Sequence, residues 1–237
     1  MTRRRWIADE HFGDQAALTG SHAVHLVRVL RARVGEEFDI AAGNRVRRGR
    51  ISKITEERVE FDLGEHLATI AIPHVILLLA VFKFDRMEWA IEKVTELGVS
   101  RIMPVIAERT DAHLASASVK RVERWERIAW QASEQSRRST APEIARPVKL
   151  TEALDQNSSL RVVLAETERN QSLKGALHSH GGVGEVSLAI GPEGGWTNDE
   201  IARFGKTGWI SASLGNTVLR AETAAIAATT IVLSELA

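Results

Sequence analysis

The 237-residue sequence contains no cysteine. This absence excludes disulfides, thiolate nucleophiles, iron–sulfur clusters and cysteine-ligated zinc, and it is typical of proteins in a reducing compartment. Long hydrophobic runs are also missing, because the apolar run over residues 75–82 is too short to span a bilayer. The first eleven residues carry charges where a signal peptide would need an apolar run. We therefore expect a cytoplasmic protein with no membrane partner.

The sequence also lacks a net charge, with 31 Lys and Arg against 31 Asp and Glu. The charges are unevenly distributed, however. Residues 28–53 hold 8 basic and 3 acidic side chains, whereas residues 151–237 hold 6 basic and 10 acidic ones. A local basic cluster can attract phosphate even in a neutral chain. A solvated set of strand and turn arginines is the alternative, and charge alone does not decide between them.

The hydrophobic pattern predicts two domains. Residues 1–70 are β-rich, because apolar and polar positions alternate over residues 34–63 around a turn at 42–44. A short helix with Ser21 as its N-cap precedes this segment. The second domain covers residues 73–237, where predicted strands at 75–82, 101–110, 160–167, 185–193 and 209–215 alternate with helices, among them 86–99, 119–138 and 221–236. Such alternation is typical of an α/β fold with a mostly parallel sheet.

Two glycine-containing loops follow predicted strands near the C-terminus. IGPEGGWTNDEI leads into a helix for which Thr197 and Glu200 form a capping box. LGNTVLRAETAAIAA passes through Gly215 and presents Arg220 and Glu222 at the next helix start. Either loop alone could be a tight turn that needs glycine only for its geometry. Together, at the carboxyl ends of parallel strands, they predict a ligand-binding cleft, although neither is a Walker or GxGxxG motif.

Other candidate sites have simpler interpretations. The pairs His22/His25 and His178/His180 have no further ligand at a metal-binding spacing, so we predict no metal site. Trp125, on the long charged helix, is interpreted as a core residue rather than a base-stacking one.

The paired loops resemble the cofactor loops of the RsmE family, which comprises uridine N3-methyltransferases of small-subunit (16S) ribosomal RNA in the knotted SPOUT superfamily. Three further segments are similar to the family's pattern: HAVHLVRVLRARVGEEFDI, KFDRMEWAIEKVTELGVSRIMPVIAERT and EQSRRSTAPEI. The resemblance covers nearly the whole chain, in the right order. The family usually has Pro-Arg after the LG of its last loop, whereas this chain has Asn216-Thr217. The missing arginine concerns substrate contact more than cofactor binding.

This resemblance implies a PUA-like RNA-binding β-barrel over residues 1–70 and a trefoil-knotted methyltransferase domain over residues 73–237. It implies a homodimer that binds S-adenosylmethionine and methylates N3 of a uridine in small-subunit ribosomal RNA, within the assembled subunit. A non-catalytic RNA-binding or ribosome-assembly module with the same knotted fold is the alternative. The intact glycine loops favour the enzyme, and the missing arginine at Thr217 favours the module.

Candidate site residues follow from the two loops and the resemblance. Removal of the N3 proton spreads negative charge onto the flanking carbonyl oxygens of uracil, and Arg220 is expected to stabilise it, with Glu222 holding Arg220 or favouring the helix start. The best phosphate contacts are Arg28, Arg31, Arg137 and Arg138. The expected cofactor contacts are Ala165, Glu166, Ile190, Gly191, Pro192, Glu193, Gly194, Leu214, Gly215, Asn216, Val218, Leu219, Arg220 and Thr223, with the adenine between Ile190, Leu214 and Leu219.

Overall fold

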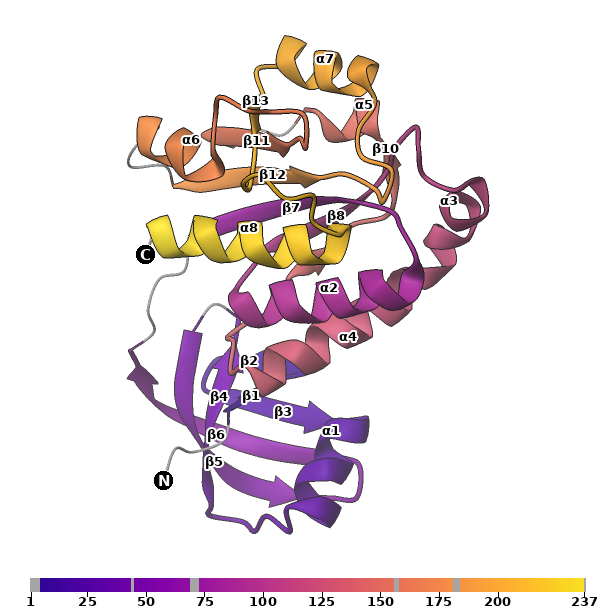
Figure 1. Cartoon of the computed structure of the whole chain (residues 1–237). Coiled ribbons are helices and arrows are strands. Elements are labelled where there is room, and N and C mark those ends of the chain that lie inside the picture. Colours follow the sequence, from indigo (N-terminus) through magenta and orange to yellow (C-terminus); the bar gives the residue numbers. More distant parts are fainter. Residues whose placement is uncertain (1–4, 44, 69–72, 156–157, 181–183, 237) are drawn as a thin grey trace. The chain divides into compact units, whose positions relative to one another are not determined.

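A computed structural model of the chain describes residues 5–43, 45–68, 73–155, 158–180 and 184–236 (Figure 1). The chain divides into two compact units, one of Met1–Ala71 with Ser133–Ala141 and one of Ile72–Ala132 with Pro142–Ala237. The sequence pattern predicts a second domain that covers all of residues 73–237. In the structure, residues 133–141 group with the first unit instead. The expected boundary at residues 70–73 lies mostly outside the described residues.

The first unit is built on a six-stranded sheet. Its strand order is β1 (Arg5–Ile7), β4 (Glu37–Ala42), β5 (Arg45–Ile54), β6 (Arg58–Leu67), β3 (Gln15–Thr19) and β2 (Glu10–Phe12). Only the β1–β4 pair is parallel. The predicted alternation is present, since Val59, Phe61 and Leu63 on β6 are buried while Asp62 and Gly64 are exposed.

The helix of the first unit begins earlier than predicted. Helix α1 spans Gly20–Val24 and continues into a π-helical turn, His25–Val29. The expected N-cap Ser21 is wrong, because Thr19 occupies that position and Gly20, at φ +52°, turns the chain into the helix. Glycine adopts this conformation without steric cost.

The second unit contains a parallel sheet. Its order is β10 (Val148–Lys149), β8 (Arg101–Ile106), β7 (His74–Ala80), β12 (Glu185–Ile190), β11 (Leu160–Leu164) and β13 (Ile210–Ala212), and β9 (Glu143–Ile144) also pairs with β8. Every pairing is parallel. The predicted α/β class with a mostly parallel sheet is therefore confirmed.

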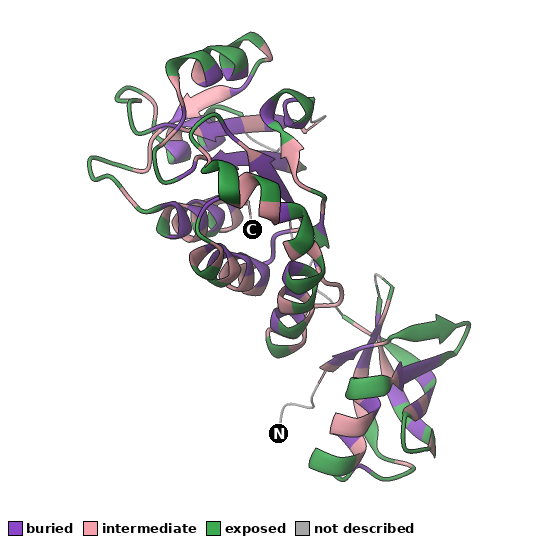
Figure 2. Cartoon of the chain, turned by 90° about the vertical axis from the view of Figure 1, so that its right-hand side faces the viewer, coloured by how far each residue is buried: buried purple, intermediate pink, exposed green. Residues whose placement is uncertain are grey.

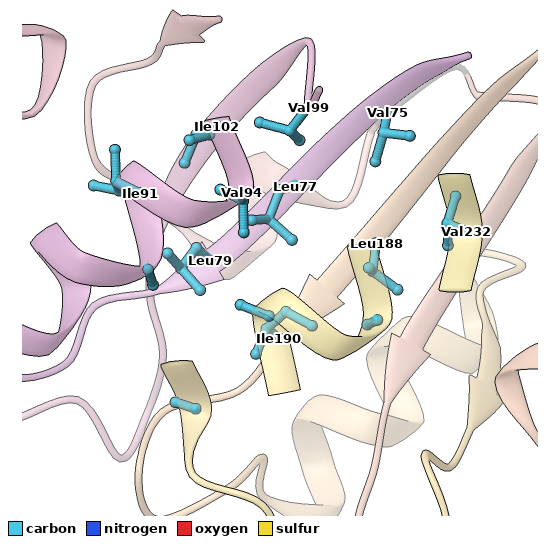
Figure 3. Close-up of a cluster of buried hydrophobic side chains, with 14 of the residues drawn as sticks. Val75, Leu77, Leu79, Ile91, Val94, Val99, Ile102, Leu188, Ile190 and Val232 are labelled. Atoms are coloured by element: carbon cyan, nitrogen blue, oxygen red, sulfur yellow. The ribbon is translucent and has the colours of Figure 1, made fainter. Parts of the chain in front are cut away.

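Both faces of this sheet are covered. Val75, Leu77 and Leu79 on β7 point into one hydrophobic cluster (Figure 3), and Ile76 and Leu78 point into the other. This explains why β7 is apolar at every position from Val75 to Ala80 rather than at alternate ones. In Figure 2 the buried residues are concentrated on these strands and on the inner sides of the helices.

The helices that cover the first face include α2 (Phe84–Leu97), α4 (Val122–Gln135), α6 (Leu173–Ser179) and α8 (Ala221–Leu236). Helices α5 (Leu150–Ala153) and α7 (Asn198–Lys206) cover the other face. Helix α3 (Ala112–Ser118) follows β8 in sequence. Helices α2 and α8 lie side by side (Figure 1). Among the described residues, no helix combines the length and apolar character needed to cross a bilayer.

Two helix predictions have different outcomes. Helix α2 ends as expected at Gly98, which has φ +122°. The helix expected over 119–138 begins with a 3₁₀ turn, Val119–Arg121, and its α-helical part ends at Gln135. Arg137 has φ +60°, which a continuing right-handed helix cannot accommodate. Trp125 is fully buried, so its interpretation as a core residue is confirmed.

Candidate functional site

A cavity of about 510 Å³ lies at the carboxyl ends of β11, β12 and β13. Because these strands are parallel, the loops that follow them emerge at the same edge of the sheet. The cavity is lined by residues of these three loops, and Arg86 and Arg109 reach it from the segments after β7 and β8.

The structure brings most of the expected cofactor residues together. Those that line the cavity are Ala165, Glu166, Ile190, Gly191, Pro192, Glu193, Leu214, Gly215, Asn216, Val218, Leu219 and Arg220. Gly194 and Thr223 are not among the lining residues. A Cβ atom at Gly194 would meet the side chain of Arg109 at 3.3 Å, and Thr223 is an exposed residue of α8. That both residues contact the cofactor stays a prediction.

The first glycine loop, residues 191–197, is fixed by several contacts. The Gly195 N–H donates to the Pro192 carbonyl at 2.8 Å, and Arg109 Nη1 donates to the Gly194 carbonyl at 2.6 Å. The predicted capping box of Thr197 and Glu200 is present at the start of α7. Glu200 is fully buried, and it also accepts a hydrogen bond from the Glu108 N–H at 2.8 Å. This loop is thus held by the strands and helix around it.

The second loop, residues 213–220, is held much less firmly. Gly215 has φ +130°, a conformation that favours glycine, and Gly215, Asn216 and Thr217 are exposed. Val218 is 76% exposed. In the described part of the chain, no side chain of residues 214–220 makes a hydrogen bond or an ion pair. Few side-chain contacts hold this loop, so we expect it to move more than the first loop.

Arg220 and Glu222 do not form an ion pair among the described residues. One of the two roles expected for Glu222, holding Arg220 in position, required such a pair. Glu222 is buried in the first turn of α8, and its Oε1 lies 3.8 Å from Nε of Arg86 on α2. The Glu222 Oε2 atom is buried and has no hydrogen-bond partner among the residues that the structure describes. Arg220 is exposed and points to no carboxylate within ion-pair distance among the described residues. The second expected role of Glu222 agrees with its position, since a carboxylate in the first turn favours the helix start.

The walls of the cavity combine apolar and polar groups. Ile190, Leu214 and Leu219 supply apolar surface. Trp196 is 9% exposed, and its buried Nε1 has no hydrogen-bond partner among the described residues. A Cβ atom at Gly191 would lie 3.2 Å from this nitrogen, so glycine allows the backbone to pass close to the indole. Such walls suit a ligand with a flat apolar ring and several polar groups.

Sequence reasoning missed several side chains of this site, among them Arg86, Arg109, Arg169 and Trp196. Trp196 lies inside the glycine motif, and its place in that motif could have identified it as a residue of the site. Arg86 and Arg109 come from distant segments that only the folded sheet brings to this edge. Arg169 follows β11, whose exit loop was expected to contribute only Ala165 and Glu166.

The expected RNA contacts all belong to the first unit. Arg28, Arg31 and Arg137 are exposed, and Arg31 and Arg137 have φ +54° and +60°. Non-glycine residues adopt this conformation infrequently. Arg138 is different, because its Nε donates to the Thr140 carbonyl at 3.1 Å and burial lowers its pKa to about 10. It remains cationic at neutral pH, but its guanidinium is less available to a phosphate.

One histidine of each pair, His22 and His178, has a carboxylate partner. His22 Nδ1 lies 2.8 Å from Asp9 Oδ1, and this hydrogen bond raises the pKa of His22. His178 Nε2 lies 2.6 Å from Glu235 Oε2. Across the residues with described positions, no group of three or more His, Cys, Asp or Glu side chains could hold a metal ion.

Comparisons with known proteins point to one family. A family model described as an RNA methyltransferase domain matches residues 71–233. A ribosomal RNA small subunit methyltransferase E of Synechocystis is 32% identical over 212 residues, which cover 87% of this chain and 69% of that protein. The protein of the same name from Rickettsia conorii is 30% identical over 224 residues, covering 89% and 86% of the two chains.

A crystal structure of the corresponding protein from Neisseria gonorrhoeae, bound to S-adenosyl methionine, is also similar. Its TM-score is 0.83 at 28% sequence identity, and the match covers 96% of this chain and 95% of that one. The similarity extends over both compact units.

Proposed function

The chain belongs to the RNA methyltransferase domain family and, within it, to the ribosomal RNA small subunit methyltransferase E proteins. From this premise we propose that it methylates N3 of a specific uridine in small-subunit ribosomal RNA. The proposed methyl donor is S-adenosylmethionine. The observation that carries the proposal is the cavity formed by both glycine loops at the carboxyl ends of the parallel strands. A bound donor of this kind is present in the similar Neisseria protein.

The residues of the cavity suit S-adenosylmethionine. Ile190, Leu214 and Leu219 provide apolar surface for the adenine, and Gly191 and Gly215 let the backbone come close. The indole of Trp196 lies against Gly191 and adds apolar surface to the cavity wall. When bound, S-adenosylmethionine supplies an electrophilic methyl group on a positively charged sulfur.

In the proposed reaction, the chain's own groups stabilise the uracil as it loses its N3 proton. The N3–methyl bond forms as the sulfur–methyl bond breaks, and the N3 proton passes to a general base. The remaining negative charge spreads over the carbonyl oxygens beside N3. Arg220 lines the cavity and has no carboxylate partner among the described residues, so its charge is available to these oxygens.

We assign RNA binding to the first unit, as a PUA-like barrel. Arg28 and Arg31 are exposed cations, and between and beyond them Val29 and Val34 are 64% and 62% exposed. Arginine forks match phosphate oxygens, and exposed aliphatic groups can pack on unstacked bases. We therefore expect Arg28→Gln and Arg31→Gln to weaken RNA binding and flatten its salt dependence while the affinity for the methyl donor stays the same.

The second unit is proposed to carry the trefoil knot and the dimer contact. After edge strand β13 the chain returns past β11 and β12 to α8, which packs on β12, β7 and α2. This late return of the chain across the sheet supports the proposed knot. Helix α8 is rich in small apolar residues on all sides, and Ile226 and Ile231 are only partly buried. Light scattering that gives a monomer at micromolar concentration would contradict the homodimer.

Two measurements test the proposed function. Calorimetric titration with S-adenosylmethionine should give a measurable heat of binding, whereas a non-catalytic ribosome-assembly module would bind no donor. Mass mapping of small-subunit RNA from a deletion strain should then show one unmethylated uridine, restored by the intact gene but not by an Arg220→Ala variant. Assembled subunits and naked RNA, offered separately, identify the substrate, which we expect to be the assembled subunit in the cytoplasm.

A further inference from the structure

Arg86 contacts two segments that form different walls of the cavity. Its Nη1 donates to Glu193 Oε1 at 3.1 Å, and its Nε lies 3.8 Å from Glu222 Oε1. Glu193 belongs to the loop between β12 and α7, and Glu222 belongs to the first turn of α8. One guanidinium group on α2 therefore joins the first glycine loop to the helix that follows the second loop.

The burial of Glu222 makes this contact important. Its side chain is 8% exposed, and Arg86 is its one ionic partner among the described residues. A buried carboxylate is costly without a compensating cation. Glu222 does not line the cavity, whereas Arg86 and Glu193 do. Glu222 thus contacts the Nε side of the Arg86 guanidinium from the protein interior. The Nη1 side of the same guanidinium faces Glu193.

The other arginines of the cavity do not make this connection. Arg109 donates to a backbone carbonyl within the first loop, at Gly194. In the described part of the chain, the guanidinium groups of Arg169 and Arg220 make no hydrogen bond or ion pair. Of the cavity arginines, Arg86 is therefore the one that links both loop systems through side chains.

We propose that Arg86 is a positioning residue that holds the first glycine loop against the start of α8, and that Glu222 acts through Arg86 rather than through Arg220. This inference rests on the proposed function, because the two segments are argued to bind S-adenosylmethionine between them. Arginine suits the task, since its planar fork can contact two carboxylates at once and a lysine ammonium matches that geometry less well. Prior fixation of the loop lowers the ordering cost of binding.

The test compares Arg86→Gln and Arg86→Lys with the unaltered protein. Arg124→Gln is a matched control, because Arg124 forms an exposed pair with Glu88 of α2 at 2.7 Å and does not line the cavity. In the ligand-free protein, amide hydrogen exchange over residues 190–197 should rise in Arg86→Gln and stay unchanged in Arg124→Gln. The dissociation constant for S-adenosylmethionine should rise about tenfold in Arg86→Gln, the effect of losing one charge-assisted contact.

Steady-state kinetics separates positioning from catalysis. Arg86→Gln should raise the KM for the methyl donor about as much as the dissociation constant, while kcat falls by less than about threefold. Arg86→Lys should recover part of the affinity. Because Arg86 and Glu193 act as a pair, the double variant Arg86→Gln/Glu193→Gln should weaken binding by less than the sum of the two single effects.

Different failures have different meanings. Unchanged hydrogen exchange and unchanged affinity in Arg86→Gln would overturn the positioning role while the proposed function stands. A loss of kcat with unchanged KM would also overturn it, since Arg86 would then act in the reaction itself. If the unaltered protein bound no S-adenosylmethionine, the proposed function would fail, and the exchange measurement would still decide whether Arg86 fixes the loop. If Arg86→Gln did not fold, Arg86→Lys would carry the same comparison.

Discussion

The two glycine loops of the second unit line the same cavity but are held in opposite ways. Arg109, Arg86 and the Thr197–Glu200 capping box fix the loop over residues 191–197. The loop over residues 213–220 is largely exposed, and its side chains from 214 onward make no hydrogen bonds among the described residues. Both loops leave parallel strands at the same edge of one sheet, so strand geometry does not explain the difference. Side-chain contacts made from other elements explain it.

This difference suggests a division of roles under the proposed function. A wall that is fixed before the ligand arrives contributes affinity, because little conformational entropy is lost on binding. A loop with few contacts can close over the ligand and substrate and place its side chains at that moment. We therefore expect donor affinity to depend mainly on the first loop, and turnover and substrate contact to depend mainly on the second.

The largest expected effect is on turnover, from the second loop. Arg220→Ala should lower kcat about a hundredfold or more, the scale of losing one oriented group that stabilises developing charge. Affinity for S-adenosylmethionine should stay within a few-fold, measured by calorimetry. Arg169→Ala is the matched control, because Arg169 also lines the cavity and is exposed. An equal loss of affinity in Arg220→Ala would place Arg220 in the donor-binding wall and weaken the contrast between the loops.

A pair of glycine substitutions compares the loops directly. A Cβ atom at Gly191 would lie 3.2–3.3 Å from three atoms of the Trp196 indole, which is itself buried. A Cβ atom at Gly215 would meet nothing within 4 Å, and only its φ of +130° opposes a side chain. Because the first loop cannot relax and the second can, Gly191→Ala should weaken donor binding about tenfold and Gly215→Ala about threefold. The reverse order would contradict the proposed rigidity of the first loop.

A pair of threonine substitutions gives a smaller effect, on stability. The Thr197 side chain accepts a hydrogen bond from the Glu200 N–H at 3.2 Å and caps α7. Thr197→Ala should lower the free energy of unfolding by about 1 kcal/mol, measured by urea denaturation. Thr217 is exposed on the second loop, so Thr217→Ala should change it by less than about 0.5 kcal/mol. Equal losses would show that the second loop is also held in place.

Local sequence signals predicted the parts of the site that depend on neighbouring residues. The apolar runs of β7 and β12, the stop at Gly98 and the capping box all follow from patterns within a few positions. The contact of Arg86 with Glu193 joins residues 107 positions apart, and no local pattern indicates it. The end of α4 was missed for a related reason, because arginine is a good helix former and nothing in its vicinity announced the left-handed conformation of Arg137.

The same limit applies to the division of the chain. Residues 133–138 continue the helical pattern that was predicted over residues 119–138 and that starts in the second unit, so the grouping of residues 133–141 with the first unit could not be inferred from periodicity. It depends on long-range contacts such as the hydrogen bond from Arg5 to the Arg137 carbonyl. The family resemblance identified the loops and their order, and the position of each side chain around the cavity required the folded sheet.

The smallest expected effect comes from restoring the family's arginine in the second loop. Thr217 lines the cavity and is exposed, so an arginine there has room. One added phosphate contact should tighten RNA binding about threefold at moderate salt and steepen its salt dependence by about one ion. Donor affinity should change little, because it depends mainly on the first loop. Val218→Arg is the control, because Val218 is the neighbouring residue and is 76% exposed. If the position of the arginine matters, Val218→Arg should give a smaller gain in RNA affinity than Thr217→Arg. Equal gains from both variants would mean that the second loop adds only general positive charge. No gain from either would mean that this loop does not approach the RNA backbone, and the substrate contact would then have to come from the first unit.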